Sequence, residues 1–221
     1  MRSFLIGQIK KMLKDQYNPE DWTPKYNPWD QRLCAVPSAD LFRAIKKGTA
    51  HVVTDTIKSF EKDGIELNSG NKIEADIIIT ATGLKVQLFG GMNIEVDGKP
   101  LHMPDSPAFK GVMLSDVPNF ALALGYTNAS WTLKSDLNCR YFTKVLNLME
   151  QKNYNVCIPR FPHDTMEKQR LLDFDANYIL RANDILPKQG TSGPWKVEQN
   201  YIKDLMALGY GSPKDKYLEY A

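Results

Sequence analysis

One stretch of this chain, residues 72–84, constrains the fold more than any other. Within it, residues 77–80 are four apolar or β-branched side chains in a row, with no polar alternation. Such a run, bounded by turn-forming residues, predicts a strand buried on both faces, as in a parallel sheet. Ala81, Thr82 and Gly83 follow at once. Small residues at the carboxyl end of a buried strand let a ligand approach the backbone, although a core strand that ends at an ordinary glycine has the same pattern.

Composition argues against several classes of protein. The 221 residues are 43% hydrophobic and 24% charged, which is typical of one large or two small globular domains. The net charge of +2 offers no footprint for nucleic acid, and no apolar run approaches a membrane span. The first residues lack the apolar region and cleavage site of a signal peptide. Scattered cysteines and histidines predict neither disulfides nor a metal site, and indicate a reducing, cytoplasmic setting.

The first part of the chain predicts two helices and a meander. Residues 2–14 form an amphipathic pattern with lysines off the apolar face, which either packs on a core or lies on a membrane surface. Residues 38–47 predict a second helix, with Ser38 as N-cap and Gly48 just past the end. Between residues 57 and 74, Asp-Gly and Ser-Gly turns separate short apolar runs. They predict three antiparallel strands that lead into the buried strand.

The second part predicts a strand, a turn and several helices. Residues 120–124 are a second apolar run, residues 125–130 a glycine-led turn, and residues 131–150 a long helix. This order aims backbone N–H groups at a ligand with electron-rich atoms, although it also occurs as a purely structural unit. Further helices are expected over residues 164–181, from a capping box, and over residues 194–208.

The chain has sheet ends suited to a nucleotide but no phosphate-binding fingerprint. Neither Gly-x-Gly-x-x-Gly nor a glycine-rich loop with Lys-Ser/Thr occurs in it. We therefore predict an α/β fold corresponding to the carboxyl half of a flavoprotein with two dinucleotide-binding domains, built from a β-meander, buried parallel strands and long flanking helices. Its aromatic- and proline-rich loop, residues 25–37, carries Arg32, which offers a rigid cation for an anion or forms an ordinary surface salt bridge.

Three segments carry a resemblance to a known family: residues 26–34 (Tyr-Asn-Pro-Trp-Asp-Gln-Arg-Leu-Cys), 75–84 (Ala-Asp-Ile-Ile-Ile-Thr-Ala-Thr-Gly-Leu) and 125–134 (Gly-Tyr-Thr-Asn-Ala-Ser-Trp-Thr-Leu-Lys). They resemble class B flavin-dependent monooxygenases, and within that group the Baeyer–Villiger enzymes of the ethionamide-activating type. Residues 186–190 and 194–201 fit as well. The match covers only about the carboxyl half of such an enzyme, because both nucleotide-binding glycine motifs and the signature Phe-x-Gly-x-x-x-His-x-x-x-Trp are absent.

The resemblance implies a domain assignment and a chemistry. Residues 1–83 would be the remainder of an NADP-binding domain with linker and meander, and residues 84–221 the carboxyl part of an FAD-binding domain with a helical tail. In this family NADPH reduces FAD, and O₂ adds to give a flavin C4a-peroxide. The peroxide inserts oxygen into a ketone or oxidises the sulfur of a thio-compound.

The resemblance also implies site residues. Arg32 matches the active-site arginine, which holds the anionic oxygen species in a dry site and helps to position the nicotinamide. Gln31 lies beside it, where many relatives carry a lysine near the 2′-phosphate of NADP. The other cofactor-binding residues implied are Ala81, Thr82 and Gly83 in the hinge strand, and Asn128, Ala129, Ser130 and Trp131 at the turn and helix start that face the flavin ring.

Three hypotheses remain open at this point. The chain is the carboxyl half of a Baeyer–Villiger monooxygenase, a non-catalytic remnant that folds or docks without cofactor, or a subunit that needs a partner carrying the glycine motifs. We expect little activity from the chain alone, and both FAD and NADPH to require the amino-terminal half. Sheet edges normally covered by upstream strands would favour that partner or self-association.

Overall fold

The chain folds into two compact units. The computed structural model describes residues 1–28, 30–31, 33–34, 36–127, 129–173 and 176–221. The first unit is built on Met1–Leu84, and the second on Lys85–Asp173 and Tyr178–Ala221. Both mix helices with strands, and all the paired strands of the described residues are antiparallel. The predicted α/β class is thus confirmed in its coarse form, whereas parallel strands are not.

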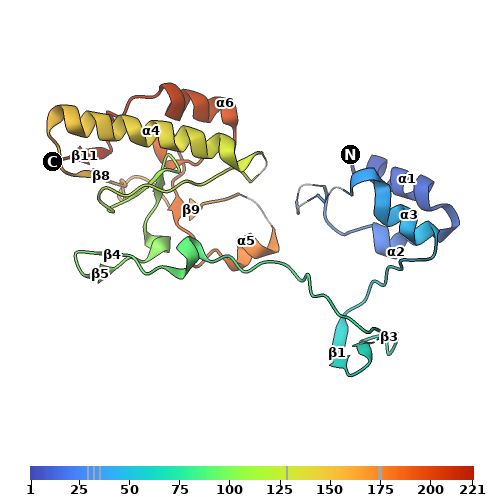
Figure 1. Ribbon diagram of the computed structural model, residues 1–221. Helices are drawn as coiled ribbons and strands as arrows, with labels where there is room; N and C mark the ends of the chain where they lie inside the picture. Colours follow the sequence, from blue (N-terminus) through green and yellow to red (C-terminus); the bar gives the residue numbers. More distant parts are fainter. Residues whose placement is uncertain (29, 32, 35, 128, 174–175) are drawn as a thin grey trace. The chain divides into compact units, whose positions relative to one another are not determined.

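The first unit contains three short helices and a three-stranded meander (Figure 1). Its elements are α1 (Arg2–Leu13), α2 (Pro19–Trp22), α3 (Asp40–Lys46), β1 (Ile57–Glu61), β2 (Gly64–Leu67) and β3 (Lys72–Glu74), with 3₁₀ turns at Lys14–Gln16 and Pro37–Ala39. The predictions of the first helix and of the meander are confirmed. Trp22 and Phe42 join α2 to α3, with ring centroids 5.3 Å apart.

The predicted ends of the second helix are half right. Gly48 has a φ of 72° just past α3 and donates its N–H to the Ile45 carbonyl, as expected of a residue at C′. Ser38 is not the N-cap, because Pro37 starts a 3₁₀ turn one residue earlier and Ser38 lies inside that turn with a φ of 56°. Ala39 takes the N-cap position without a side-chain bond.

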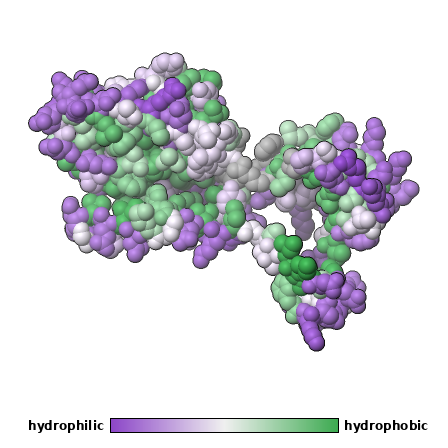
Figure 2. Space-filling view, viewed as in Figure 1, coloured by the Kyte–Doolittle hydropathy of each residue, from purple (hydrophilic) through white to green (hydrophobic). Residues whose placement is uncertain are grey.

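The first unit buries very little apolar surface. Among its described residues up to Leu84, only Leu13 and Leu67 are buried hydrophobic side chains. Residues 77–80 form no strand, and Ile77 and Ile79 are 80% and 86% exposed, so the prediction of a buried strand is not met here. Figure 2 shows hydrophobic surface beside the meander. The physical reason is that a strand needs neighbours for its backbone hydrogen bonds, and β1 to β3 pair only with one another.

The second unit is organised around one long helix, α4 (Trp131–Lys152). Its other elements are β4 (Glu95–Val96), β5 (Lys99–Pro100), β6 (Ala108–Phe109), β7 (Met113–Leu114), β8 (Cys157–Pro159), β9 (Gln169–Arg170), α5 (Asn177–Arg181), β10 (Lys188–Gln189), α6 (Tyr201–Asp204), a π-helix (Leu205–Tyr210), β11 (Leu218–Tyr220), and 3₁₀ turns at Leu88–Gly91, Met103–Asp105 and Gly193–Trp195. The strands pair as short two-stranded ladders, of which β4–β5 and β6–β7 are hairpins, whereas β9–β10 and β8–β11 join strands that are distant in sequence. The helix α6 and the π-helix lie along α4 (Figure 1).

Three predictions for this unit need correction. Residues 120–124 form no strand, and Leu122 donates a single N–H to the Val112 carbonyl. Residues 164–181 do not form one helix, because residues 169–170 are the strand β9, which pairs with β10, and among the described residues of this range only those of α5 are helical. The last predicted helix is split into the 3₁₀ turn at Gly193–Trp195 and the helical residues from Tyr201 onward, and between them Val197 donates its N–H to the Gln189 side chain instead of to a helical carbonyl.

The core of the second unit surrounds Trp195, which is fully buried. Its ring meets those of Phe109, Phe161 and Tyr217 edge-on, with centroids 5.1, 5.0 and 5.8 Å away. The apolar face of α4 packs into the same cluster, including Tyr141. Edge-to-face contacts of this kind add stability beyond the area they bury. None of the helices in the described ranges is long and apolar enough to cross a lipid bilayer.

We predict that Tyr141→Phe leaves stability at pH 7 unchanged or higher by up to about 1 kcal/mol, because the buried hydroxyl has no hydrogen-bond partner among the described residues. Burial also raises the pKa of Tyr141. The unfolded chain therefore releases this proton first, and stability falls as pH rises above about 10. The variant should lose less stability between pH 7 and 10.5 than the parent in urea unfolding. A cost above about 1 kcal/mol at pH 7 would contradict this reading.

Candidate functional site

The predicted site residues divide between the two units. Gln31, Ala81, Thr82 and Gly83 belong to the first unit, and Ala129, Ser130 and Trp131 to the second. Arg32 and Asn128 lie outside the described residues. The convergence of these positions on one cofactor therefore stays a prediction.

The residues in the first unit have irregular backbone. Gln31 is partly buried and forms an isolated bridge with Pro28. Ala81, Thr82 and Gly83 are exposed and belong to no strand, and Gly83 has a φ of 103°. A φ of this size favours glycine, because it lies in the region of backbone conformation that residues with a side chain rarely adopt.

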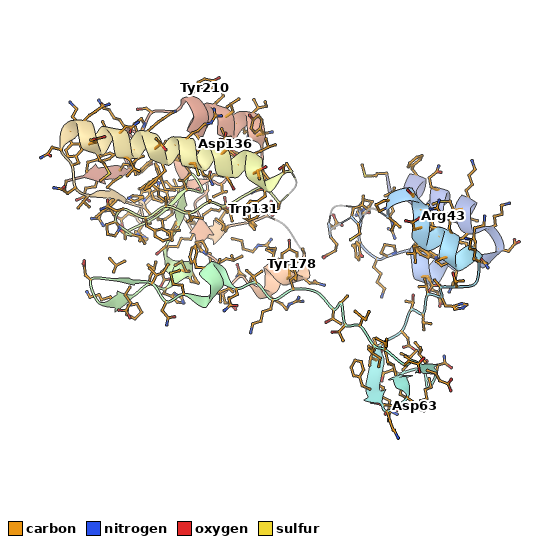
Figure 3. All side chains as sticks on the ribbon, viewed as in Figure 1. Arg43, Asp63, Trp131, Asp136, Tyr178 and Tyr210 are labelled. Atoms are coloured by element: carbon orange, nitrogen blue, oxygen red, sulfur yellow. The ribbon has the colours of Figure 1, made fainter. Side chains whose placement is uncertain are left out.

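The turn before α4 is held close to the helix start by Gly125. Its nearest neighbour is the Trp131 indole, since a Cβ added at Gly125 would lie 2.1 Å from Trp131 Cδ2. Figure 3 shows Trp131 near the amino-terminal end of α4. Trp131 is 54% exposed, so one part of its indole covers the turn and the other is open to solvent. Glycine is required here for space, because any side chain would displace the ring.

The outer side of this turn presents backbone donors. Ala129 and Ser130 are exposed, and Ser130 is the N-cap residue of the 22-residue helix α4 without capping it through its side chain. Its hydroxyl lies 2.9 Å from that of Thr132 instead. The first N–H groups of a helix have no partner within the helix, and its amino-terminal end carries partial positive charge. The arrangement suits an electron-rich acceptor lying against the turn.

The inner side of the turn rests on a buried ion pair. Lys134, in the first turns of α4, is fully buried and donates from Nζ to Asp204 Oδ2 at 2.9 Å and to the Glu198 carbonyl at 2.6 Å. Tyr126 donates its hydroxyl to the same carboxylate oxygen at 2.7 Å. The ammonium group also lies 5.0 Å from the centre of the Tyr126 ring. These contacts compensate the cost of removing the charges from water.

Electrostatics fix the protonation of Tyr126. Burial, and then its hydrogen bond to the Asp204 carboxylate, raise the pKa of Tyr126 above its ordinary value. The phenol therefore stays protonated and remains a donor throughout the neutral range.

A second tie comes from Gln199. Its Oε1 accepts the backbone N–H of Thr127 at 2.9 Å and the Thr127 hydroxyl at 3.1 Å. The turn is thus tied from inside by residues 198–204, while its outer edge is left exposed.

The sequence did not single out Lys134, Asp204 or Gln199 as site residues. Lys134 occurs in a motif that carries the family resemblance, but its partner lies 70 positions away. No local pattern links two such residues, and periodicity alone would place a lysine on the solvated face of a helix. Among the described residues no cluster of three metal-ligating side chains occurs.

Comparison with characterised proteins gives strong matches over the whole chain. The chain is 45% identical to the FAD-containing monooxygenase EthA of Mycobacterium tuberculosis and 43% identical to EthA of Mycolicibacterium smegmatis, in both cases over 100% of the chain and 45% of the relative. It is 45% identical to the "Probable FAD-binding monooxygenase AlmA" of Acinetobacter baylyi, over 94% of the chain and 42% of that protein. No family model matches the chain.

Over its full length this chain is similar to FAD-containing monooxygenases. The resemblance predicted from three sequence segments is therefore confirmed. The chain spans somewhat less than half the length of these monooxygenase relatives, which is consistent with the predicted carboxyl half.

Gly125→Ala tests the packing of the turn that carries this monooxygenase resemblance. We expect a loss of about 1–3 kcal/mol in the free energy of unfolding, because the added methyl group displaces the Trp131 ring. In a Trp131→Ala background the same change should cost less than about 0.5 kcal/mol, since nothing is left to displace. Urea unfolding of the four proteins measures the coupling. Equal costs in both backgrounds would show that the ring does not limit the space at Gly125.

Proposed function

We propose that this chain is the carboxyl portion of an FAD- and NADPH-dependent monooxygenase that inserts oxygen into ketones, in the Baeyer–Villiger manner, or oxidises the sulfur of thio-compounds. The observation that carries the proposal is the 45% identity over the whole chain to a protein named as an FAD-containing monooxygenase. The cytoplasmic location expected from the free, scattered cysteines belongs to the same proposal.

The residues of the second unit fit one wall of a flavin site. When bound, reduced FAD supplies the electrons that activate O₂ for transfer to the substrate. The N–H groups at the start of α4 would donate hydrogen bonds to the electron-rich edge of the ring, and the exposed part of the Trp131 indole would help to exclude water. Arg32 would supply a cation that stays charged at every physiological pH and so steadies negative charge near the reacting oxygen.

The apolar run of the first unit supports the view that further polypeptide completes the fold. Ile77 and Ile79 are largely exposed, and residues 77–80 make no ladder. We propose that these residues, and residues 120–124, become buried parallel strands when the amino-terminal half of the enzyme supplies neighbouring strands. The same exposure favours, as second candidate, a non-catalytic subunit that docks on a partner carrying the nucleotide-binding glycine motifs.

The test is assembly with an amino-terminal half from a related monooxygenase. We expect the chain alone to bind little FAD and to show no NADPH oxidation. The mixture or co-expressed pair should copurify with flavin and convert a ketone to an ester with NADPH consumption, as measured by absorbance near 450 nm and by product analysis. Copurification without turnover would favour the docking subunit, and failure to copurify or to bind flavin would contradict the proposed function.

Arg32→Ala tests the role assigned to the arginine. In the assembled enzyme we expect ester formation to fall by about 10²-fold or more, the scale of losing one electrostatic contact to developing charge, while flavin reduction by NADPH is partly retained. Stopped-flow absorbance separates these two steps. Arg43→Ala, which removes an exposed arginine paired with Asp40 on α3, is the matched control and should behave as the parent. An undiminished ester yield in the Arg32 variant would remove Arg32 from the mechanism.

A further inference from the structure

The tail of the second unit, residues 197–204, supplies the partners of the turn before α4. Gln199 holds Thr127, Asp204 holds Tyr126, and Lys134 joins Asp204 to the Glu198 carbonyl. We call this set of contacts the tail clamp, and its side chains are those of Tyr126, Thr127, Lys134, Gln199 and Asp204. Each contact joins positions that are more than 60 residues apart in sequence, so the tail adds long-range ties to a turn that α4 itself contacts through Trp131.

The tail itself is anchored before it reaches the clamp. The Gln189 side chain accepts the Val197 N–H at 2.7 Å and donates to the Arg170 carbonyl at 2.9 Å. The Val197 side chain lies against Gly111, where an added Cβ would be 3.3 Å from it and 3.7 Å from Lys134 Cε. Val197 and Gly111 thus pack beside Lys134, which is fully buried and cannot move without displacing its neighbours.

Lys144 provides a contrast on the same helix. It is partly buried and also joins α4 to the tail, donating from Nζ to the carbonyls of Leu208, Gly209 and Gly211 at the end of the π-helix. Lys144 thus fixes the far end of the tail, and none of its hydrogen bonds to described residues involves the turn. Loss of Lys144 should loosen the packing of the tail on α4 without changing the turn. Loss of Lys134 should loosen that packing and also change the turn.

We propose that Lys134, Asp204 and Gln199 are positioning residues that fix the described residues of the turn, 125–127 and 129–130, against α4. They occupy the inward groups of the turn, the Tyr126 hydroxyl and the Thr127 N–H, so that the exposed Ala129 and Ser130 are presented outward in one geometry. Resting on the proposed function, this outward geometry is what seats the flavin ring. A binding surface held rigid in advance loses less entropy when its ligand binds.

Hydrogen exchange in the chain without cofactor tests the clamp itself. Lys134→Met and Asp204→Asn should speed exchange of the Thr127 amide by about tenfold or more relative to the Val145 amide in the core of α4. Lys144→Met should change the exchange rates of the Thr127 and Val145 amides by the same factor. A second pair of variants leaves the buried charges in place and serves if the Lys134 or Asp204 variant does not fold. Gln199→Ala should speed exchange of the Thr127 amide. Gln199→Glu keeps an acceptor oxygen and should return the exchange rate of this amide to that of the parent. If the exchange rate of the Thr127 amide changes by the same factor as that of the Val145 amide in every variant, the proposed role of the clamp is wrong.

Flavin binding in the assembled enzyme tests whether the tail clamp contributes to the flavin site. Lys134→Met should weaken FAD affinity by about tenfold and alter the visible circular dichroism of bound flavin, and Lys144→Met should alter neither. Unchanged affinity and spectrum in Lys134→Met would overturn the link to flavin. If the parent assembly binds no FAD, the proposed function fails, and the exchange result still decides whether the clamp exists.

Discussion

The buried ion pair between Lys134 and Asp204 is the contact on which the arrangement of the turn before α4 depends. Both side chains are withdrawn from water, so their charges are stable only with each other and with the Tyr126 hydroxyl and Glu198 carbonyl in place. The start of α4, the turn before it and the tail therefore all contact one another at this ion pair. The hydrophobic core around Trp195 supplies bulk stability, whereas the ion pair specifies how the turn is oriented on that core.

The two units differ in how much apolar surface each one buries within itself. The second has a continuous core with α4 at its centre, while the first has short helices, a small meander and an exposed isoleucine run. This contrast agrees with a chain that spans about 45% of the length of its monooxygenase relatives. A sheet divided between two stretches of polypeptide leaves apolar strand residues uncovered in whichever stretch is considered alone.

Elements specified by local signals could be predicted from the sequence. The helix α1, the long helix α4 and the three-stranded meander depend on periodicity and on Asp-Gly and Ser-Gly turns within a few residues. Residues 77–80 and 120–124 could not be placed, because a strand is completed by neighbours rather than by its own pattern. The family motifs indicated Trp131 and its turn, but the partners of that turn, Asp204 and Gln199, are distant in sequence and carry no local signal.

We infer that the turn before α4 (residues 125–127 and 129–130) and the start of that helix form one wall of a flavin site. The most direct measurement is an experimental structure of the chain assembled with an amino-terminal half and FAD. We predict that the isoalloxazine ring lies in contact with the Ala129–Ser130 backbone, with Lys134, Asp204 and Tyr126 joined behind it as they are here. Flavin bound elsewhere, with this turn facing solvent, would contradict the account.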